Sequence, residues 1–206
     1  ELRELMNHQS SENVKVIVLL RSQADMNSIN QAVGRIGGLE VVTKFEIIPA
    51  ALIQGPLSKI SELFSIREIR SVYLNKEIWV TPLNKTSTRV APASYVPPWM
   101  DSIDLPNLKV ANGSEVKIAI ADSGIDASHP DLAGRVVASN SFVTTPNGYL
   151  SDEPETADSL GHGTYVAGIA AGSGALNSVY RGVAPKATLL NARCMDSLGR
   201  GMTAGI

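Results

Sequence analysis

A short apolar run that ends in a carboxylate is the feature that most constrains the fold of this chain. Residues 116–121 read Val-Lys-Ile-Ala-Ile-Ala, and Asp122-Ser123-Gly124 follows directly. A nearly continuous run of this kind predicts a strand of a parallel sheet that is covered on both faces. Because open α/β sheets build their sites at the carboxyl ends of the strands, Asp122 is a candidate site residue. Asp-Ser-Gly is also ordinary turn chemistry, and that alternative stays open at this point.

The second candidate is His162, which lies between Gly161 and Gly163 and precedes a run of small residues at 166–172. The run predicts a tightly packed helix that begins near the histidine. The positive end of a helix dipole disfavours an imidazolium, so a histidine that accepts a proton there needs a nearby anion. Asp122 would supply it by bonding one ring nitrogen and leaving the other to face a nucleophile. A simple polar helix cap is the alternative role for a lone histidine.

Four motifs follow one another along the chain: DSGID at 122–126, HPDL at 129–132, GHGTYVAG at 161–168 and GVAP at 182–185. This series resembles the subtilisin-like serine proteases. The resemblance implies an Asp-His-Ser triad in which Asp122 orients the ring and His162 is the general base and acid. Tyr165 replaces a second histidine that is usual in the family, and Leu160 replaces a frequent Asn. Both departures bear on the neighbouring substrate pocket and leave the two triad residues unchanged.

The resemblance extends to a candidate substrate-binding edge. Residues 188–194 predict another strand, and residues 196–203 resemble the turn and exposed edge that pair with the substrate backbone in this family. Gly199, Arg200 and Gly201 are the candidate substrate-binding residues, because the glycines leave room for a peptide to add as an antiparallel strand. A glycine-rich turn between a strand and a helix is the alternative.

The nucleophile of the implied triad is missing from the 206 residues. By resemblance, the Gly-Thr-Ser nucleophile and an oxyanion-stabilising Asn would lie after Ile206. No serine present has comparable surroundings, and Ser173, in Gly-Ser-Gly, is better explained as part of a loop. We therefore expect a serine endopeptidase precursor truncated before its nucleophile, and we expect the 206-residue chain to be inactive by itself.

The first ninety residues contain none of these motifs and predict a separate domain. The expected order is β-α-β-β-α-β, the split ferredoxin-like unit. Its predicted strands are 14–20, 39–45, 50–54 and 68–74; one helix is capped by Asp25 and stopped by Gly37-Gly38, and the other starts at Pro56 with Leu57, Ile60, Leu63 and Phe64 on one face. By resemblance, this domain is a propeptide, an intramolecular chaperone and inhibitor that docks on its own catalytic domain.

The predicted fold class is therefore an α+β ferredoxin-like propeptide domain followed by the incomplete N-terminal part of an α/β subtilisin-like parallel-sheet domain. We expect the propeptide or inhibitor domain at residues 1–80 and the truncated catalytic domain at 99–206. The polar, Pro-punctuated residues 81–98 predict a linker with the processing site.

Composition excludes several classes of protein. Of the 206 residues 44% are hydrophobic and the formal net charge is −2, which is ordinary for a soluble chain. No apolar span reaches the length of a membrane helix, and no basic patch with interleaved aromatic residues suggests nucleic acid. The expected partner is a peptide or protein substrate. Cys194, the single cysteine, lies in an apolar strand and is expected to be a buried structural thiol. The first residues are no signal peptide, so secretion is implied by the family alone.

No cofactor is expected for the chemistry, and the sequence does not identify a metal or its ligands. The resemblance implies structural calcium with Asp131 as one ligand. The loop at 172–181, however, offers only Asn177 and no carboxylate, which is a poor cage for an ion that takes six to eight oxygens. An acidic cluster could bind a cation, although a solvated acidic loop is the default; its members are Asp152, Glu153, Glu155 and Asp158.

Two other functions remain open. In the first, the chain is a protease-inhibitor or chaperone module that acts through its N-terminal domain. In the second, it is an unrelated phosphate- or metal-handling α/β hydrolase that uses Asp122, His129 and His162. The hydrolase is disfavoured because no second carboxylate stands two residues after Asp122 and no phosphate-cradling glycine loop follows a strand.

Overall fold

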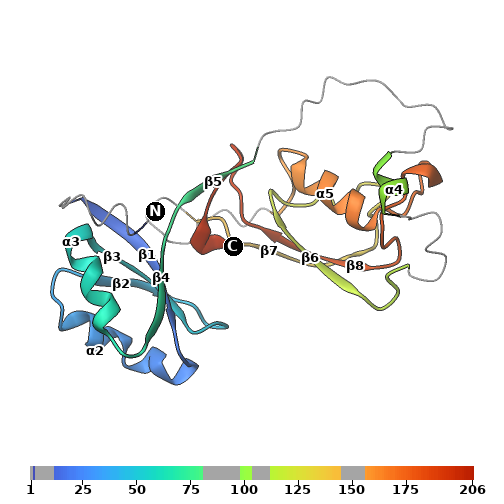
Figure 1. Ribbon diagram of the computed structural model, residues 1–206. Helices are drawn as coiled ribbons and strands as arrows, with labels where there is room; N and C mark the ends of the chain where they lie inside the picture. The colour runs from blue at the N-terminus through green and yellow to red at the C-terminus, as the bar shows by residue number, and fades with distance from the viewer. Residues whose placement is uncertain (1, 3–11, 81–97, 104–111, 145–155) are drawn as a thin grey trace. The chain divides into compact units, whose positions relative to one another are not determined.

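The computed structural model describes residues 2, 12–80, 98–103, 112–144 and 156–206. The chain divides into two compact units (Figure 1). Of the described residues, the first unit contains 2, 12–77, 144 and 202–204, and the second contains 78–80, 98–103, 112–143, 156–201 and 205–206. The expected linker at 81–98 lies outside the described residues except for Pro98. No helix in the described ranges is long and apolar enough to cross a membrane.

The first unit is an antiparallel sheet of four strands in the order β2-β3-β1-β4. Val16 and Val18 of β1 are fully buried, and they pack in one core cluster with Ile29, Val33 and Ile60 from the helices. The elements are β1 (Asn13–Leu20), η1 (Gln23–Asn27), α2 (Ile29–Gly34), β2 (Glu40–Lys44), β3 (Ala50–Pro56), α3 (Leu57–Ile60), η2 (Ser61–Ser65) and β4 (Ile69–Leu74).

Two details of this unit differ from the expectation. Phe64 is 53% exposed, whereas Leu57, Ile60 and Leu63 are buried. Residues 61–65 form a 3₁₀ helix, in which positions three apart stay aligned and the fourth turns away from the core. Asp25 is not the N-cap of a helix: it lies within η1, and its carboxylate accepts hydrogen bonds from the backbone N and the hydroxyl of Ser22, both at 2.9 Å.

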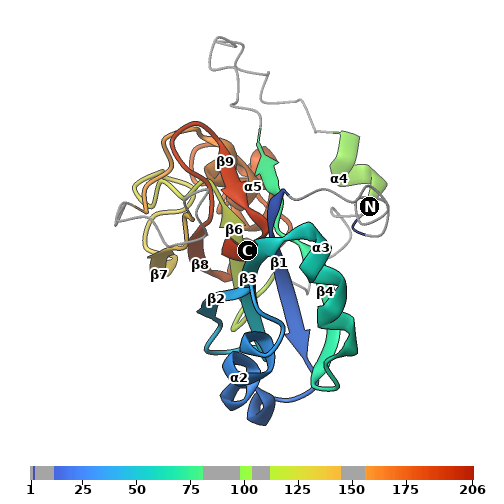
Figure 2. The same cartoon turned by 90° about the vertical axis from the view of Figure 1, so that its left-hand side faces the viewer.

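The second unit contains a parallel sheet in which β8 lies between β6 and β7 (Figure 2). This confirms the parallel pairing predicted from residues 116–121. The expected cover on both faces is wrong for the described residues, because Lys117, Ala119 and Ala121 are exposed on one face while Ile120 and Asp122 are buried on the other. Asp122 is the last residue of β6 and lies beside Arg193 of β8. The elements are α4 (Pro98–Ser102), β6 (Lys117–Asp122), β7 (Val136–Ser141), α5 (His162–Ala171), η4 (Ser178–Tyr180) and β8 (Thr188–Arg193).

A further two-stranded sheet joins β5 (Glu77–Trp79) to β9 (Arg200–Met202), which is followed by η5 (Thr203–Gly205). Val80 N donates to Gly199 O at 2.8 Å, just beyond the ends of the two strands. Val80 and Gly199, the two residues of this bond, both belong to the second unit.

Small side chains let helix α5 lie close to the parallel sheet. Its residues Gly163, Ala167 and Ala171 are buried at a spacing of four, so they form one face of the helix. Ala167 and Ala171 pack in a core cluster with Ile120 of β6 and Leu189 of β8. The first turn of α5 is thereby held against the carboxyl end of β6, where Asp122 lies.

Candidate active site

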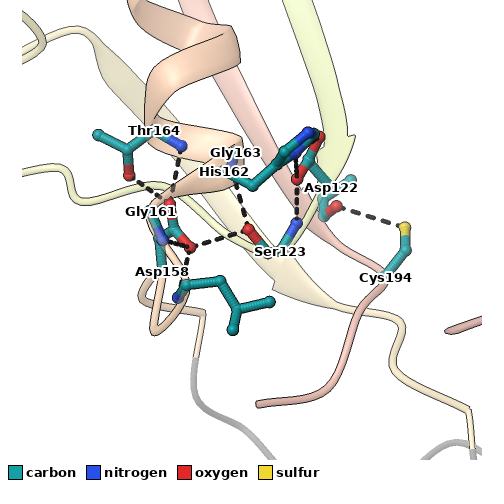
Figure 3. A network of polar contacts seen from close by, with 10 residues as sticks. Asp122, Ser123, Asp158, Gly161, His162, Gly163, Thr164 and Cys194 are labelled. Carbon is teal, nitrogen blue, oxygen red and sulfur yellow. Dashed lines mark hydrogen bonds and ion pairs between the residues drawn. The ribbon is translucent and has the colours of Figure 1, made fainter. Parts of the chain in front are cut away.

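Asp122 and His162 form a direct pair at the end of β6 and the start of α5 (Figure 3). Nδ1 of His162 lies 2.7 Å from Oδ1 and 2.9 Å from Oδ2 of Asp122. The carboxylate side chain is 10% exposed and the imidazole 29%. Because an ionised carboxylate only accepts hydrogen bonds, Nδ1 carries the ring proton and its N–H donates the hydrogen bond to Asp122. The other ring nitrogen, Nε2, is then the acceptor.

The tight approach of helix and strand explains the glycine on each side of His162. Gly161, the N-cap of α5, has φ 84°, a left-handed conformation that favours glycine. A Cβ at Gly163 would overlap the carbonyl oxygen of Gly124 and would lie 3.1 Å from the Cβ of Asp122. A larger residue would therefore push the imidazole away from its carboxylate.

Asp158 holds the first turn of α5 from the preceding loop. Its Oδ1 accepts hydrogen bonds from Ser123 Oγ (2.8 Å), Leu160 N (3.0 Å) and Gly161 N (2.8 Å). Its Oδ2 accepts from the backbone N and the hydroxyl of Thr164, at 2.8 and 2.7 Å. Burial raises the pKa of this carboxyl, but the hydrogen bonds from Thr164, Ser123 and Gly161 outweigh burial and leave the pKa below its ordinary value.

This finding corrects one sequence-based expectation. The sequence predicts that Asp158 belongs to a solvated acidic loop, whereas the side chain is partly buried and accepts hydrogen bonds on both oxygens. The other three members of that acidic cluster, Asp152, Glu153 and Glu155, lie outside the described residues. Ser123, which is fully buried, also belongs to the site, although the sequence patterns do not indicate it.

Cys194 lies next to the pair on the neighbouring strand end. It is 2% exposed, and its backbone N donates to the carbonyl oxygen of Asp122 at 2.7 Å. Burial, reinforced by the negative charge of Asp122, raises the pKa of the thiol to about 11. The thiol therefore stays protonated at neutral pH, as expected for a structural cysteine.

The candidate substrate-binding residues Gly199, Arg200 and Gly201 lie at a tight turn and at the start of β9. Gly199 has φ 78°. Asp196 fixes the turn: its Oδ1 accepts from the backbone N of Leu198 and of Arg200, both at 2.9 Å. The Arg200 guanidinium bonds Oδ2 of the same carboxylate, so this side chain supports the turn.

Leu160 and Tyr165, the two departures from the usual residues of the family, lie in different surroundings. Leu160 is buried, and its Cδ1 lies 3.2 Å from the position that a Cβ on Gly199 would take. Tyr165 is 56% exposed and lines a cavity of about 610 Å³ along α5. His129 lines the same cavity, and its Nδ1 accepts from Asp131 N at 3.2 Å.

Asp131 is the calcium ligand that the resemblance implies, and the loop at 172–181 offers only Asn177 beside it. Both side chains accept hydrogen bonds from that loop. Oδ1 of Asp131 accepts from Leu176 N at 3.2 Å and from the Ser173 hydroxyl at 3.4 Å, and Oδ1 of Asn177 accepts from Val179 N at 3.1 Å. Two side chains supply far fewer oxygens than the six to eight that calcium takes, so these two do not by themselves make a calcium site. Within the described ranges, no group of three or more His, Cys, Asp or Glu is arranged to bind a metal.

Comparison with known proteins identifies the family. Residues 113–205 match the model of the subtilase family, peptidase S8, and this match contains the paired Asp122 and His162. The chain belongs to the subtilase family, the subtilisin-like serine proteases. Serine protease AprX of Bacillus subtilis is 36% identical over 162 residues, which are 78% of this chain and 31% of AprX. Thermitase of Thermoactinomyces vulgaris is 42% identical over 92 residues, 45% of this subtilase chain and 30% of thermitase.

A solved structure has the same fold over most of the chain. The serine protease EpiP of Staphylococcus aureus, which processes the epidermin leader peptide, aligns with a TM-score of 0.56 and 20% identity in its S393A form. The alignment covers 91% of this subtilase chain and 44% of EpiP. The chain thus spans less than half of that structure and about three tenths of the length of AprX and thermitase.

Proposed function

We propose that the chain is the N-terminal part of a serine endopeptidase precursor, in which Asp122 and His162 act with a serine outside these 206 residues. The observation that carries the proposal is the contact of His162 Nδ1 with both carboxylate oxygens of Asp122, within a segment that matches the subtilase family. None of the serines in the described ranges hydrogen-bonds the His162 ring.

The proposed chemistry follows from the geometry of the pair. With Nδ1–H bonded to Asp122, Nε2 accepts the proton of the serine hydroxyl as that oxygen attacks the peptide carbonyl, and later returns the proton to the leaving amine. The imidazolium formed in between lies at the positive end of α5, where the Asp122 carboxylate offsets the unfavourable dipole. The 206-residue chain contributes the acid and the base and has no turnover by itself.

Substitution of the two residues in the protein expressed from its complete gene tests the proposal. We expect His162→Ala and Asp122→Asn each to lower kcat by about 10⁴-fold or more, with a much smaller change in KM. Hydrolysis of a peptide substrate at the wild-type rate by His162→Ala would refute the assignment.

We further propose that residues 1–80 form a ferredoxin-like propeptide that chaperones and inhibits its own catalytic domain. Two observations support this function: the β-α-β-β-α-β element order with strand order β2-β3-β1-β4, and the bond from Val80 N to Gly199 O. A strand paired with Gly199–Gly201 occupies the edge at which a substrate backbone would add.

Inhibition by the isolated domain tests this second function. A polypeptide of residues 1–83 should inhibit the mature protease with a constant in the nanomolar range, and Val80→Pro, which lacks the N–H donor, should weaken inhibition by about fivefold to tenfold. Equal inhibition by both polypeptides would show that the pairing at Val80 does not contribute.

We also propose that the protein is secreted. Only some of the relatives support this location, because they include both a minor extracellular protease and a major intracellular serine protease of Bacillus subtilis.

A further inference from the structure

Asp158 is connected to both members of the catalytic pair through short hydrogen bonds (Figure 3). Ser123 Oγ donates to Asp158 Oδ1 at 2.8 Å and accepts from Gly163 N at 3.0 Å. The backbone N of the same Ser123 donates to Oδ1 of Asp122 at 2.7 Å. One fully buried serine thus links Asp158 to the residue after His162 and to the carboxylate that binds His162.

The N–H groups at the start of α5 have no acceptor within the helix, which explains why a carboxylate is needed at position 158. The first N–H groups of a helix have no partner within the helix, and the N-cap here is Gly161, which has no side chain to cap them. Asp158 accepts from Gly161 N and Thr164 N on different oxygens and from two hydroxyls in addition. An amide has a single acceptor oxygen, so it can satisfy only one of these two sets.

We propose that Asp158 is a positioning residue of the reaction: it holds the first turn of α5 against the carboxyl end of β6 and thereby sets the contact between His162 and Asp122. The inference rests on the proposed endopeptidase function. Asp158 touches neither reacting atom, so its effect passes through Ser123 and the helix backbone. A residue that only capped the helix would change stability and leave the chemistry as it is.

Asp158→Asn separates the two roles, because it keeps the shape of the side chain and loses one acceptor oxygen. In the protein expressed from its complete gene, we expect kcat to fall by about 10-fold to 100-fold and KM to stay within about twofold, since a displacement of about 1 Å is enough for such a loss. The matched control is Asp126→Asn: Asp126 is an exposed carboxylate of the same unit that accepts from the backbone N and hydroxyl of Ser128. The control should keep the wild-type kcat.

A second readout does not depend on turnover. The ring proton that His162 donates to Asp122 should give a strongly downfield proton NMR signal in the wild type and in Asp126→Asn. In Asp158→Asn this signal should move upfield or broaden, because the ring is no longer held in place. If the wild type hydrolyses no peptide, the proposed function fails, and the NMR comparison still decides the role of Asp158.

The inference is overturned if a folded Asp158→Asn protein keeps kcat within about twofold of the wild type and keeps the downfield signal. If Asp158→Asn does not fold, Ser123→Ala takes its place, since it removes the link and leaves the carboxylate and its bonds to Gly161 and Thr164 intact. Ser123→Ala should then lower kcat by at least about fivefold with an unchanged KM, and a wild-type kcat in this variant would overturn the proposal equally.

Discussion

Gly163→Ala should lower both the stability and kcat more than any other substitution that adds one methyl group to helix α5. The new Cβ would overlap the carbonyl oxygen of Gly124 and lie 3.1 Å from the Cβ of Asp122. One obstacle is a backbone oxygen two residues after β6 and the other is the Cβ of the last residue of β6, so no flexible side chain can move aside. The helix or the strand end must shift, which costs about 1–3 kcal/mol of the free energy of unfolding.

The shift acts directly on the contact between His162 and Asp122, since His162 immediately precedes the substituted residue. A misplacement of about 1 Å costs about 100-fold in rate, so Gly163→Ala should lower kcat by about that factor. Gly168→Ala is the matched control in the same helix, because a Cβ there meets no atom within 4 Å. It should raise the free energy of unfolding by about 0.5–1 kcal/mol and leave kcat unchanged.

Urea unfolding followed by circular dichroism, together with peptide hydrolysis by the protein from its complete gene, checks both variants. If Gly163→Ala is as stable and as active as the wild type, the close packing of α5 on β6 does not position the pair, and the reasoning is wrong. Equal damage from Gly168→Ala would show that the effect comes from helix glycines in general.

The remaining predictions concern stability and metal binding. The pKa of the Cys194 thiol is about 11 in the folded protein against 9.0 in the unfolded chain, so the thiol ionises at a lower pH when the chain is unfolded. The free energy of unfolding should therefore fall by about 2–3 kcal/mol as the pH rises from 9 to 11. In urea titrations, Cys194→Ala should lack this part of the fall. Asp196→Asn should lose about 1 kcal/mol of stability. Burial raises the pKa of Asp196, but hydrogen bonding by Arg200 outweighs burial and lowers it. The wild type should therefore be more stable than Asp196→Asn above about pH 4, and this difference should vanish as the pH falls through the lowered pKa. Calcium should not raise the unfolding temperature, because the loop at 172–181 contains no carboxylate and calcium takes six to eight oxygens; a rise of several degrees on adding millimolar calcium would contradict this.

The sequence predicts the central pair because both residues lie at ends of strongly patterned elements. The apolar run that ends at Asp122 indicates a strand, and the small residues after His162 indicate a helix that can lie close to it. The structure brings the two side chains together as those patterns indicate. The strand order β2-β3-β1-β4, in contrast, is set by pairing between distant segments, on which local patterns give no information.

Asp158 could not be found by the same reasoning, since three of its five hydrogen-bond donors are backbone N–H groups, which look alike in any sequence. Its one local signal is an Asp shortly before a predicted helix start, a position that favours capping. Local patterns do not predict strand β7 (Val136–Ser141) either, because most of its residues are exposed and polar or small, and its pairing with β8 alone defines it. The helical period predicts a buried Phe64, but a 3₁₀ turn changes that period and leaves the side chain exposed.

The reaction of the complete protein with a fluorophosphonate tests the central claim most directly. The account predicts covalent labelling of a single serine that lies outside residues 1–206, strongly slowed by Asp122→Asn and abolished by His162→Ala. Labelling of a serine within the 206 residues, or labelling that is unchanged in His162→Ala, would contradict it.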